Sequence, residues 1–432
     1  MTVRAVAIMG LCVEVLYLSF YVFPSGADEV VLFMIVHTIA FLATSFTAIR
    51  LRSSQLADLR KMGWLIFTFG VLFRLSLVVH PPVASDDIYR YVWDGKVAAG
   101  GCNPFAFAPN DPSLQHLHTD VLPSHINHPT MRTIYPPFAQ AFFLFSHVLF
   151  GDALEGLKLL IVLADVATLL ILFQLFRRTP SAFVLYAWSP LPILYFGLDG
   201  HIDALGIACL LFALALFERK HVLGGAVMLS LATLAKLYPL AVAPLIGQSK
   251  NGWKRVALPA LCIALVAIGY MLYWKPTGGL FESLITFNTR FAFNGSLFHI
   301  VFPLIGSNEG AHMVCAGLFV LWWVGVAVLH RSLVEKAFLV FLGFIICSAT
   351  VHPWYLVWLA VLIPLQWSRA TYVLLGLSVV STWTVHRFRS SGVWEESVVV
   401  LLVEYVPFFV LLVHEVWKRK YLASIPRVSE QS

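Results

Sequence analysis

The stretch PPVASDDIYRYVWDGKVAAGGCNPF, residues 81–105, interrupts a chain that is otherwise mostly apolar, and it follows the third long apolar run. Ionisable side chains edged by aromatic ones are concentrated within it: Asp86, Asp87, Arg90, Asp94 and Lys96, beside Tyr89, Tyr91 and Trp93. Charged groups beside a membrane are costly to hold without partners. This segment is therefore our first hypothesis for a functional site.

The composition around this segment is that of a membrane protein. Of the 432 residues, 59% are hydrophobic and only 12% are charged, whereas soluble domains carry about 25% charged residues. The net charge of +6 does not indicate nucleic acid, because the Lys and Arg residues lie in short runs between apolar segments, as the positive-inside rule describes. We predict an all-α polytopic protein in a lipid bilayer, with no nucleic-acid partner.

About 20 apolar residues cross a bilayer, and the apolar runs predict about 13–14 transmembrane helices in a single integral membrane domain, residues 1–432. The first run lacks a small-residue cleavage site, so we expect a retained helix rather than a signal peptide. The predicted spans are 4–23, 30–49, 62–80, 156–176, 181–198, 202–217, 221–235, 238–248, 256–274, 311–330, 335–349, 354–368, 370–385 and 397–417.

The runs of Lys and Arg between the apolar segments all fall on one side of the membrane under two conditions. Segment 136–150 must lie at the interface, and segments 221–235 and 238–248 must meet near Lys236. A Pro-Pro pair suits a helix start at the first of these segments, and the Pro after Tyr238 would break a continuous helix.

Both termini are then expected in the cytoplasm. A large outer loop, 81–155, would carry interfacial amphipathic helices, and 275–310 would form a second outer loop. The polar residues that could take part in catalysis or binding therefore collect on the predicted outer face.

Ser85 has the properties of a helix N-cap, which would place Asp86 and Asp87 in a first turn. Acidic residues there could simply complement the helix dipole. Helical spacing also gives Asp87, Arg90 and Asp94 one polar face. Arg90 could pair with Asp94 or reach a bound phosphate, and both interpretations stay open.

Lys236 lies within the apolar run LSLATLAKLYPL, where an unpaired ammonium would be costly. A bound phosphate would neutralise it; the alternative is a lysine that extends to the interface. Tyr238 and His352 are weaker donor candidates, and His352 could equally be a residue of the aromatic belt.

A second polar cluster, GLDGHID, contains Asp199, His201 and Asp203, which could bind an acceptor or form a structural His–carboxylate pair. Asp and His are usual metal ligands, yet nothing in their spacing requires a metal, so we expect no metal and no cofactor. His128 and Tyr135 are either ligands or loop-packing groups.

The motifs SDDIYRYVWDG, GCNPFAFAP, INHP, TIYPPFAQ, GLDGHIDALG, LAKLYPL and HPWYLVW, in this order between about 80 and 370, resemble the membrane-embedded glycosyltransferases of the GT-C superfold. The resemblance is greatest to the bacterial branch of polyprenyl-phosphate-mannose-dependent mannosyltransferases. It implies an acidic residue on the first large outer loop that acts as catalytic base, a lipid-phosphate-linked sugar donor and inversion at the anomeric carbon. The match falls on Asp86 and Asp87, and the choice between them stays open. In this family the acidic loop usually follows the first span directly, whereas here two extra spans precede it.

We therefore predict an enzyme of the bacterial plasma (inner) membrane that moves a hexose, with mannose as the expected sugar, from a polyprenyl-phosphate donor to a glycan or lipid acceptor on the outer face. The resemblance and the residue types suggest Asp86 or Asp87 as general base. Expected donor-phosphate contacts are Lys236, Arg90, Tyr238 and His352, and expected acceptor or sugar contacts are Tyr89, Trp93, Asp94, His128, Tyr135, Asp199, His201, Asp203 and Arg290.

The alternatives are a transporter or flippase of a lipid-linked sugar and a non-enzymatic scaffold. A transporter would carry charges mid-span within repeated halves, but we find no internal repeat and the charges cluster on one loop.

Overall fold

The computed structural model describes residues 1–23, 25–52, 58–247, 252–274 and 279–424. Within these ranges the regular elements are helices, and extended pairing is limited to bridges of Phe293 and Asn294 with Thr350. The helices in chain order are α1 (Val3–Leu18), η1 (Ser19–Tyr21), α2 (Ala27–Leu51), α3 (Leu59–Leu75), α4 (Asp87–Ala99), η3 (Pro112–Leu117), α5 (Pro137–Phe150), α6 (Leu154–Phe176), α7 (Pro180–Ala187), α8 (Pro190–Pro192), η4 (Ile193–Leu198), α9 (Asp203–Glu218), α10 (Val222–Ala235), η5 (Tyr238–Gly247), α11 (Gly252–Met271), α12 (Glu282–Arg290), α13 (Ser296–Ile305), α14 (Asn308–Val328), α15 (Leu333–Cys347), η6 (Pro353–Leu356), α16 (Val357–Ala360), α17 (Arg369–Leu377), η7 (Ser378–Thr382), α18 (Trp383–Ser391) and α19 (Val398–Ser424).

The all-α fold confirms the predicted class. Among the described residues, six helical segments are long and apolar enough to cross a membrane: Val3–Tyr21, Ala27–Leu51, Leu154–Phe176, Pro180–Leu198, Asn308–Val328 and Val398–Lys418. Other apolar helices are shorter, among them α5 and α10. The predicted number of about 13–14 spans therefore exceeds the number that length and apolarity alone support.

Several predicted spans are not continuous helices. Segment 354–368 contains only the short η6 and α16, and segment 370–385 is divided into α17, η7 and the start of α18. Residues 238–247 of the predicted span 238–248 form the 3₁₀ helix η5, which contains Pro244. Proline removes a backbone donor and clashes with the preceding turn, which fits the 3₁₀ form of η5, although α11 and α19 continue through Pro259 and Pro407.

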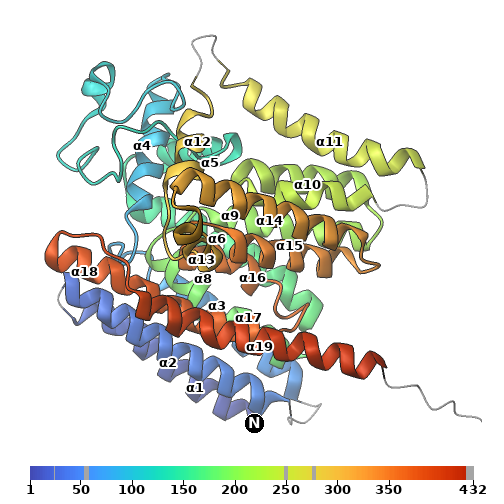
Figure 1. Cartoon of the computed structure of the whole chain (residues 1–432). Helices are drawn as coiled ribbons and strands as arrows, with labels where there is room; N and C mark the ends of the chain where they lie inside the picture. Colours follow the sequence, from blue (N-terminus) through green and yellow to red (C-terminus); the bar gives the residue numbers. More distant parts are fainter. Residues whose placement is uncertain (24, 53–57, 248–251, 275–278, 425–432) are drawn as a thin grey trace, which may run out of the picture.

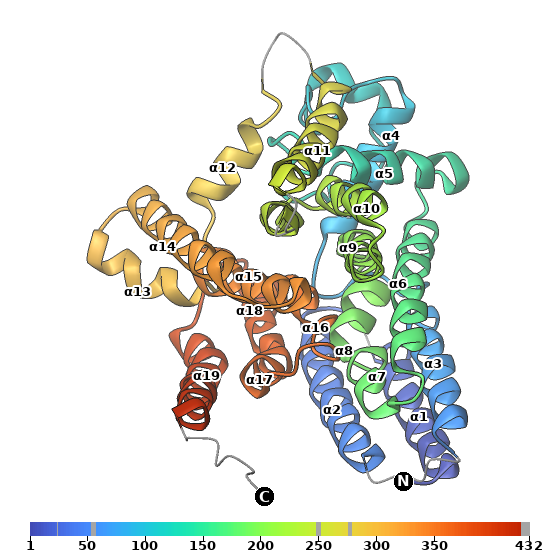
Figure 2. The same cartoon turned by 90° about the vertical axis from the view of Figure 1, so that its right-hand side faces the viewer.

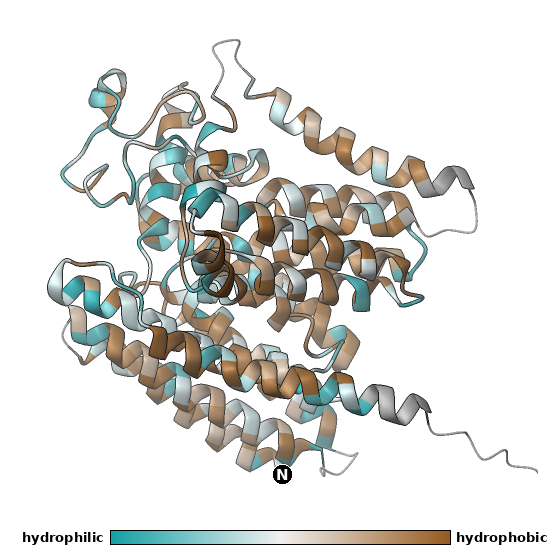
Figure 3. Cartoon of the chain, viewed as in Figure 1, coloured by the Kyte–Doolittle hydropathy of each residue, from teal (hydrophilic) through white to brown (hydrophobic). Residues whose placement is uncertain are grey.

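The long helices run side by side, and the polar segments lie at their ends. Figure 1 places α4 and the loops of residues 100–135 at the left-hand end of the bundle, which we call the loop end. Hydrophilic residues gather there, whereas the helices between the two ends are mostly apolar (Figure 3). Figure 2 separates the bundle into α1–α3 with α6 and α7, a layer of α9–α11, and a group that contains α14, α15, α17 and α19.

The helices α4 and α5 pack closely against each other at the loop end. A Cβ atom on Gly95 would lie 2.4 Å from the carbonyl oxygen of Phe143, so only glycine permits this approach. The helix α5 begins at Pro137, as predicted, and is too short to cross a bilayer. This packing holds the polar face of α4 over the ends of the apolar helices.

Candidate active site

The first turn of α4 carries two neighbouring carboxylates with different surroundings. Asp86 is the N-cap residue and Asp87 is the first helical residue; the predicted N-cap, Ser85, lies one residue too early, although its Oγ accepts from the Asp87 amide at 3.3 Å. Successive helical side chains point about 100° apart. The Oδ1 atom of Asp86 therefore lies 3.8 Å from Nη2 of Arg389, while Asp87 faces a cluster of aromatic rings.

Asp87 accepts hydrogen bonds in a partly enclosed position. The hydroxyl of Tyr135 donates to its Oδ2 at 3.3 Å and that of Tyr91 at 3.5 Å, and His201 Nδ1 lies 3.8 Å away. Burial raises the pKa of Asp87 to about 6, although the nearby Lys236 ammonium acts in the opposite direction. A carboxyl group with such a pKa can accept and release a proton near neutral pH.

Lys236 leaves α10 at its C-terminal end, where the backbone becomes extended. Its Nζ lies 3.2 Å from Oδ2 of Asp203, and it faces three tyrosine rings at 5.3–5.8 Å, those of Tyr135, Tyr238 and Tyr355. Its side chain is 13% exposed. Lys236 is thus an enclosed cation whose surroundings are aromatic on several sides.

Tyr135 connects these two groups, because its hydroxyl contacts Asp87 while its ring faces the Lys236 ammonium. The chain positions 87, 135 and 236 therefore meet in one crevice, which we call the Asp87–Lys236 crevice. Asp203 completes it from α9, where its Oδ1 also accepts from Nε1 of Trp358 at 2.8 Å.

Arg90 and Asp94 hold the segment that carries Tyr135. The Arg90 Nε lies 2.8 Å from Asp94 Oδ1, and its Nη1 donates to the carbonyl of Met131 at 2.8 Å. The second oxygen of Asp94 accepts from Thr133 at 2.6 Å and from Gln140 at 2.9 Å. Asp94 is only 1% exposed and fixes this loop, while its predicted contact with sugar stays a prediction.

Asp199 likewise fixes the backbone that leads into α4. Its Oδ1 accepts from the amides of Val83 and Ala84 at 2.7 and 3.1 Å. The following Gly200 has φ +75°, a left-handed conformation that favours glycine. Asp199 is buried and positions this backbone, while its predicted acceptor contact stays a prediction.

His201 and His352 belong to a stack of flat rings beside Asp87. Trp354 lies between them, 4.0 Å from the His201 ring and 4.2 Å from the His352 ring, and Phe293 follows at 4.8 Å from His352. The neighbouring Asn294 is held by Glu396 and Glu404 of the C-terminal region. The stack forms a rigid wall of the crevice.

Other predicted contacts lie outside the crevice. Trp93 is buried edge-on against His118, and its predicted contact with a sugar stays a prediction. The exposed His128 packs edge-on against Phe291, and Arg290 is exposed at the end of α12. The residues 275–278 of the predicted second outer loop lie outside the described ranges.

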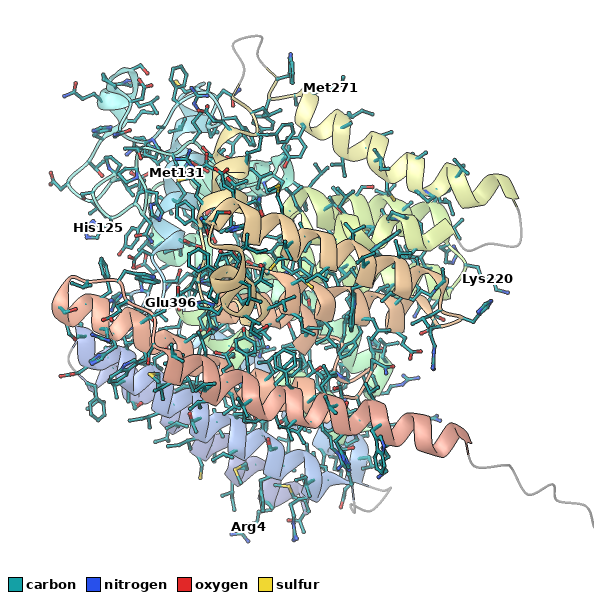
Figure 4. The ribbon with its side chains drawn as sticks, in the orientation of Figure 1. Arg4, His125, Met131, Lys220, Met271 and Glu396 are labelled. Carbon is teal, nitrogen blue, oxygen red and sulfur yellow. The ribbon has the colours of Figure 1, made fainter. Side chains whose placement is uncertain are left out.

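A cavity of about 350 Å³ adjoins the first turn of α4 on the side of Asp86. Its lining combines the α4 region, the loop that bears His125 and the helix α18: Pro82, Asp86, Tyr89, Ser124, His125, Ile126, Asn127 and Arg389. Figure 4 shows His125 at the loop end, across the molecule from Lys220. We call this space the Arg389 cavity.

The comparison with protein families identifies the chain. A family model described as "alpha-(1->6)-mannopyranosyltransferase, N-terminal domain" matches residues 3–250, more than half of the sequence. The chain belongs to the alpha-(1->6)-mannopyranosyltransferase family. No curated protein matches it significantly. Among solved structures, ArnT from Cupriavidus metallidurans, crystallised with undecaprenyl phosphate, is similar with 14% sequence identity and a TM-score of 0.46, over 83% of this chain and 73% of that one.

Membership of the mannopyranosyltransferase family confirms the predicted family resemblance and the prediction of an enzyme. The matched region contains Asp86, Asp87, Asp203 and Lys236. The roles predicted for these side chains remain predictions; Asp87, Asp203 and Lys236 lie together, whereas Asp86 faces Arg389.

Some residues of this mannopyranosyltransferase site were not among the predicted ones. Tyr355 and Trp358 contact Lys236 and Asp203 from the segment after HPW, and Arg389 meets Asp86 from α18. The aromatic spacing of HPWYLVW could have indicated the first two, but nothing in the sequence links position 389 to position 86. In the described part of the chain, no three His, Cys, Asp or Glu side chains form a group that could hold a metal ion.

Proposed function

We propose that this protein transfers a hexose, with mannose as the expected sugar, from a polyprenyl-phosphate donor to a hydroxyl of a glycan or lipid acceptor. The observation that carries the proposal is the Asp87–Lys236 crevice, in which a carboxylate of raised pKa and an enclosed ammonium lie against the same tyrosine. Glycosyl transfer from a phosphate needs these two groups: a base for the incoming hydroxyl and a cation for the departing phosphate.

In the proposed reaction the acceptor oxygen attacks the anomeric carbon as the bond from that carbon to the phosphate oxygen breaks. The hydroxyl proton passes to a carboxylate oxygen of Asp87, and the electron pair of the broken bond stays on the polyprenyl phosphate. Lys236 stabilises the charge that develops there. Attack from the face opposite the leaving group inverts the anomeric carbon.

The choice of Asp87 over Asp86 rests on their surroundings. The Asp87 side chain is 28% exposed and interacts with the Lys236 charge, while Asp86 faces Arg389 with a side chain that is 45% exposed. The tyrosines around Lys236 and the stack of His201, Trp354 and His352 would exclude water from the phosphate, which strengthens the charge interaction. Of the predicted phosphate ligands, Tyr238 and His352 lie near Lys236, whereas Arg90 is engaged by Asp94.

We further propose that the crevice opens on the outer face of a bacterial plasma membrane. The loop end and Lys220 lie at opposite ends of the helices (Figure 4), and cytoplasmic loops carry an excess of Lys and Arg. The apolar helices below the crevice would accommodate a polyprenyl tail.

The test is sugar transfer from radiolabelled polyprenyl-phosphate mannose to an oligomannoside by the full chain in membranes. Asp87→Asn should lower the rate by about 10²–10⁴-fold, the usual contribution of a general base, whereas Asp120→Asn, at an exposed carboxylate between α4 and α5, should retain it. Full transfer by Asp87→Asn with loss in Asp86→Asn would move the base to Asp86. Sugar that crosses the membrane without forming a glycosidic bond would refute the enzyme and favour a transporter.

A further inference from the structure

The Arg389 cavity lies beside the proposed catalytic base but on the other side of the first turn of α4. Asp87 is absent from its lining, whereas Asp86 forms part of it. The two carboxylates are neighbours in sequence, yet Asp86 faces Arg389 while Asp87 faces the hydroxyls of Tyr91 and Tyr135. A ligand in the cavity would therefore lie beside the residue that directly precedes the proposed base.

The lining of the cavity is polar and close to neutral in charge. Asp86 supplies an acceptor and Arg389 several donors, and their closest atoms are 3.8 Å apart, beyond a good hydrogen bond. Both side chains are partly exposed, 45% and 27% respectively. Lone pairs and N–H groups thus remain available to a ligand.

Such a lining selects a neutral polyol over an anion or a cation. A phosphate would be repelled by Asp86, and an ammonium by Arg389, while adjacent hydroxyls can donate to the one and accept from the other. Ser124 and Asn127 add further hydrogen-bonding groups from the facing loop, and the Tyr89 and His125 rings, 5.1 Å apart, form an aromatic wall. The volume of about 350 Å³ lies within the range of small-molecule sites.

We propose that the Arg389 cavity is the acceptor subsite and that it binds a neutral saccharide through adjacent hydroxyls held between Asp86 and Arg389. This inference rests on the proposed function, because it names the acceptor class of the same active site. Arg389 lies beyond residue 250, where the family match ends. The acceptor would therefore be chosen jointly by the matched loop and by the unmatched helix α18.

The test measures binding of an α-linked mannose disaccharide to the full chain in detergent micelles, without any donor, by saturation-transfer NMR. Arg389→Gln should weaken binding about tenfold or more, as expected when a charged hydrogen-bond donor is lost. Asn127→Ala, on the facing wall, should weaken it less. The matched control is Arg387→Gln on the same helix, because Arg387 pairs with Glu395 outside the cavity; it should bind the disaccharide as the native chain does.

Transfer kinetics give the second measurement. In Arg389→Gln the KM for the acceptor should rise about tenfold while the KM for the polyprenyl-phosphate donor stays unchanged. Unaltered disaccharide binding in both cavity variants, or preferential binding of mannose phosphate, would overturn the subsite. Saccharide binding that depends on Arg389 without any transfer by the native chain would uphold the subsite and refute the proposed reaction, so the two failures are distinguishable.

Discussion

Two buried ion pairs, Arg74–Asp165 within the bundle and Lys236–Asp203 in the crevice, place the same kinds of charge in very different surroundings. Arg74 and Asp165 are both fully enclosed, with 2.5 Å between Nε and Oδ2. Lys236 and Asp203 are 3.2 Å apart, and Lys236 remains partly accessible. The comparison shows what separates a charge pair that holds helices together from one that is available to a substrate.

The enclosed pair is surrounded by polar partners from three helices. Arg74 donates from Nη1 to the carbonyls of Gly70 and Ala187 at 2.7 and 2.9 Å, and Tyr186 donates to the other Asp165 oxygen at 2.5 Å. These contacts join α3, α6 and α7. Nη2 of Arg74 is buried without a hydrogen-bond partner among the described residues, but the other contacts compensate most of the charge, and full enclosure leaves the pair little capacity to bind anything else.

The crevice pair is compensated only in part. Lys236 has one carboxylate in contact, a second carboxylate nearby in Asp87, and otherwise the faces of tyrosine rings. Ring faces attract a cation weakly compared with a charged ligand. The two ion pairs therefore differ in how completely their charges are compensated and in whether a ligand can reach them. Both are buried.

The largest expected effect tests the structural side of the comparison. Asp165→Leu should destabilise the protein by about 3–5 kcal/mol, because it leaves the Arg74 guanidinium buried without its partner. The measurement is thermal unfolding in micelles, and the molecules that remain folded should transfer sugar normally. The double variant Arg74→Leu with Asp165→Leu should recover most of the stability. A stable Asp165→Leu protein without activity would show that this pair takes part in catalysis.

The second expected effect tests the functional side. Lys236→Gln should lower the rate of sugar transfer by about 10²–10³-fold, the usual loss when a group that stabilises transition-state charge is removed. Its effect on thermal unfolding should be smaller than that of Asp165→Leu, because Trp358 still donates to Asp203. The control is Lys96→Gln, which breaks a more exposed pair with Asp152. Normal sugar transfer by Lys236→Gln would show that the Lys236–Asp203 pair, like the Arg74–Asp165 pair, has only a structural role.

The smallest expected effect concerns pH. Since Asp87 must be ionised to accept a proton, transfer should rise with pH and level off above about 6. The pKa in the folded protein lies above the ordinary value of 3.8, so the contribution of Asp87 to the free energy of unfolding decreases as pH rises from about 4 to about 6.

The hydrogen bond from Tyr135 favours the charged form of Asp87 and lowers its pKa. Tyr135→Phe should therefore shift the acidic limb of the rate profile to higher pH and reduce the plateau rate by about tenfold at most, the loss expected for one hydrogen bond. The control is Tyr405→Phe, at a buried tyrosine that bonds Asn294 instead. An acidic limb that stays in place would show that a group other than Asp87 controls the rate.

Much of this fold followed from local sequence features. Long apolar runs predicted α2, α6, α14 and α19, because burying an uninterrupted backbone in lipid requires a helix. The Pro-Pro pair predicted the start of α5 at Pro137. The interrupted runs near Pro190 and Pro353 were predicted less well, because the detailed path after a proline depends on the helices that pack around it.

The candidate site, like the fold, was predicted from the sequence only in part. A lysine in an apolar run and two adjacent carboxylates were noticeable from the sequence, since such charges need partners. The sequence did not distinguish Asp94 and Asp199, which hold backbone and loops, from Asp87, which faces Lys236. It did not single out the pair of Arg74 and Asp165, although both residues lie within predicted spans.

By itself, then, the sequence determined that the chain forms apolar helices, that a polar segment interrupts them, and which motifs relate it to glycosyltransferases. These properties depend on neighbours within a few turns, where hydrophobicity and proline act directly. Only the tertiary structure decided that Asp87, Tyr135 and Lys236 share one crevice and that Asp86 faces Arg389. Contacts between residues more than a hundred positions apart depend on how whole helices pack, and no local pattern encodes that arrangement.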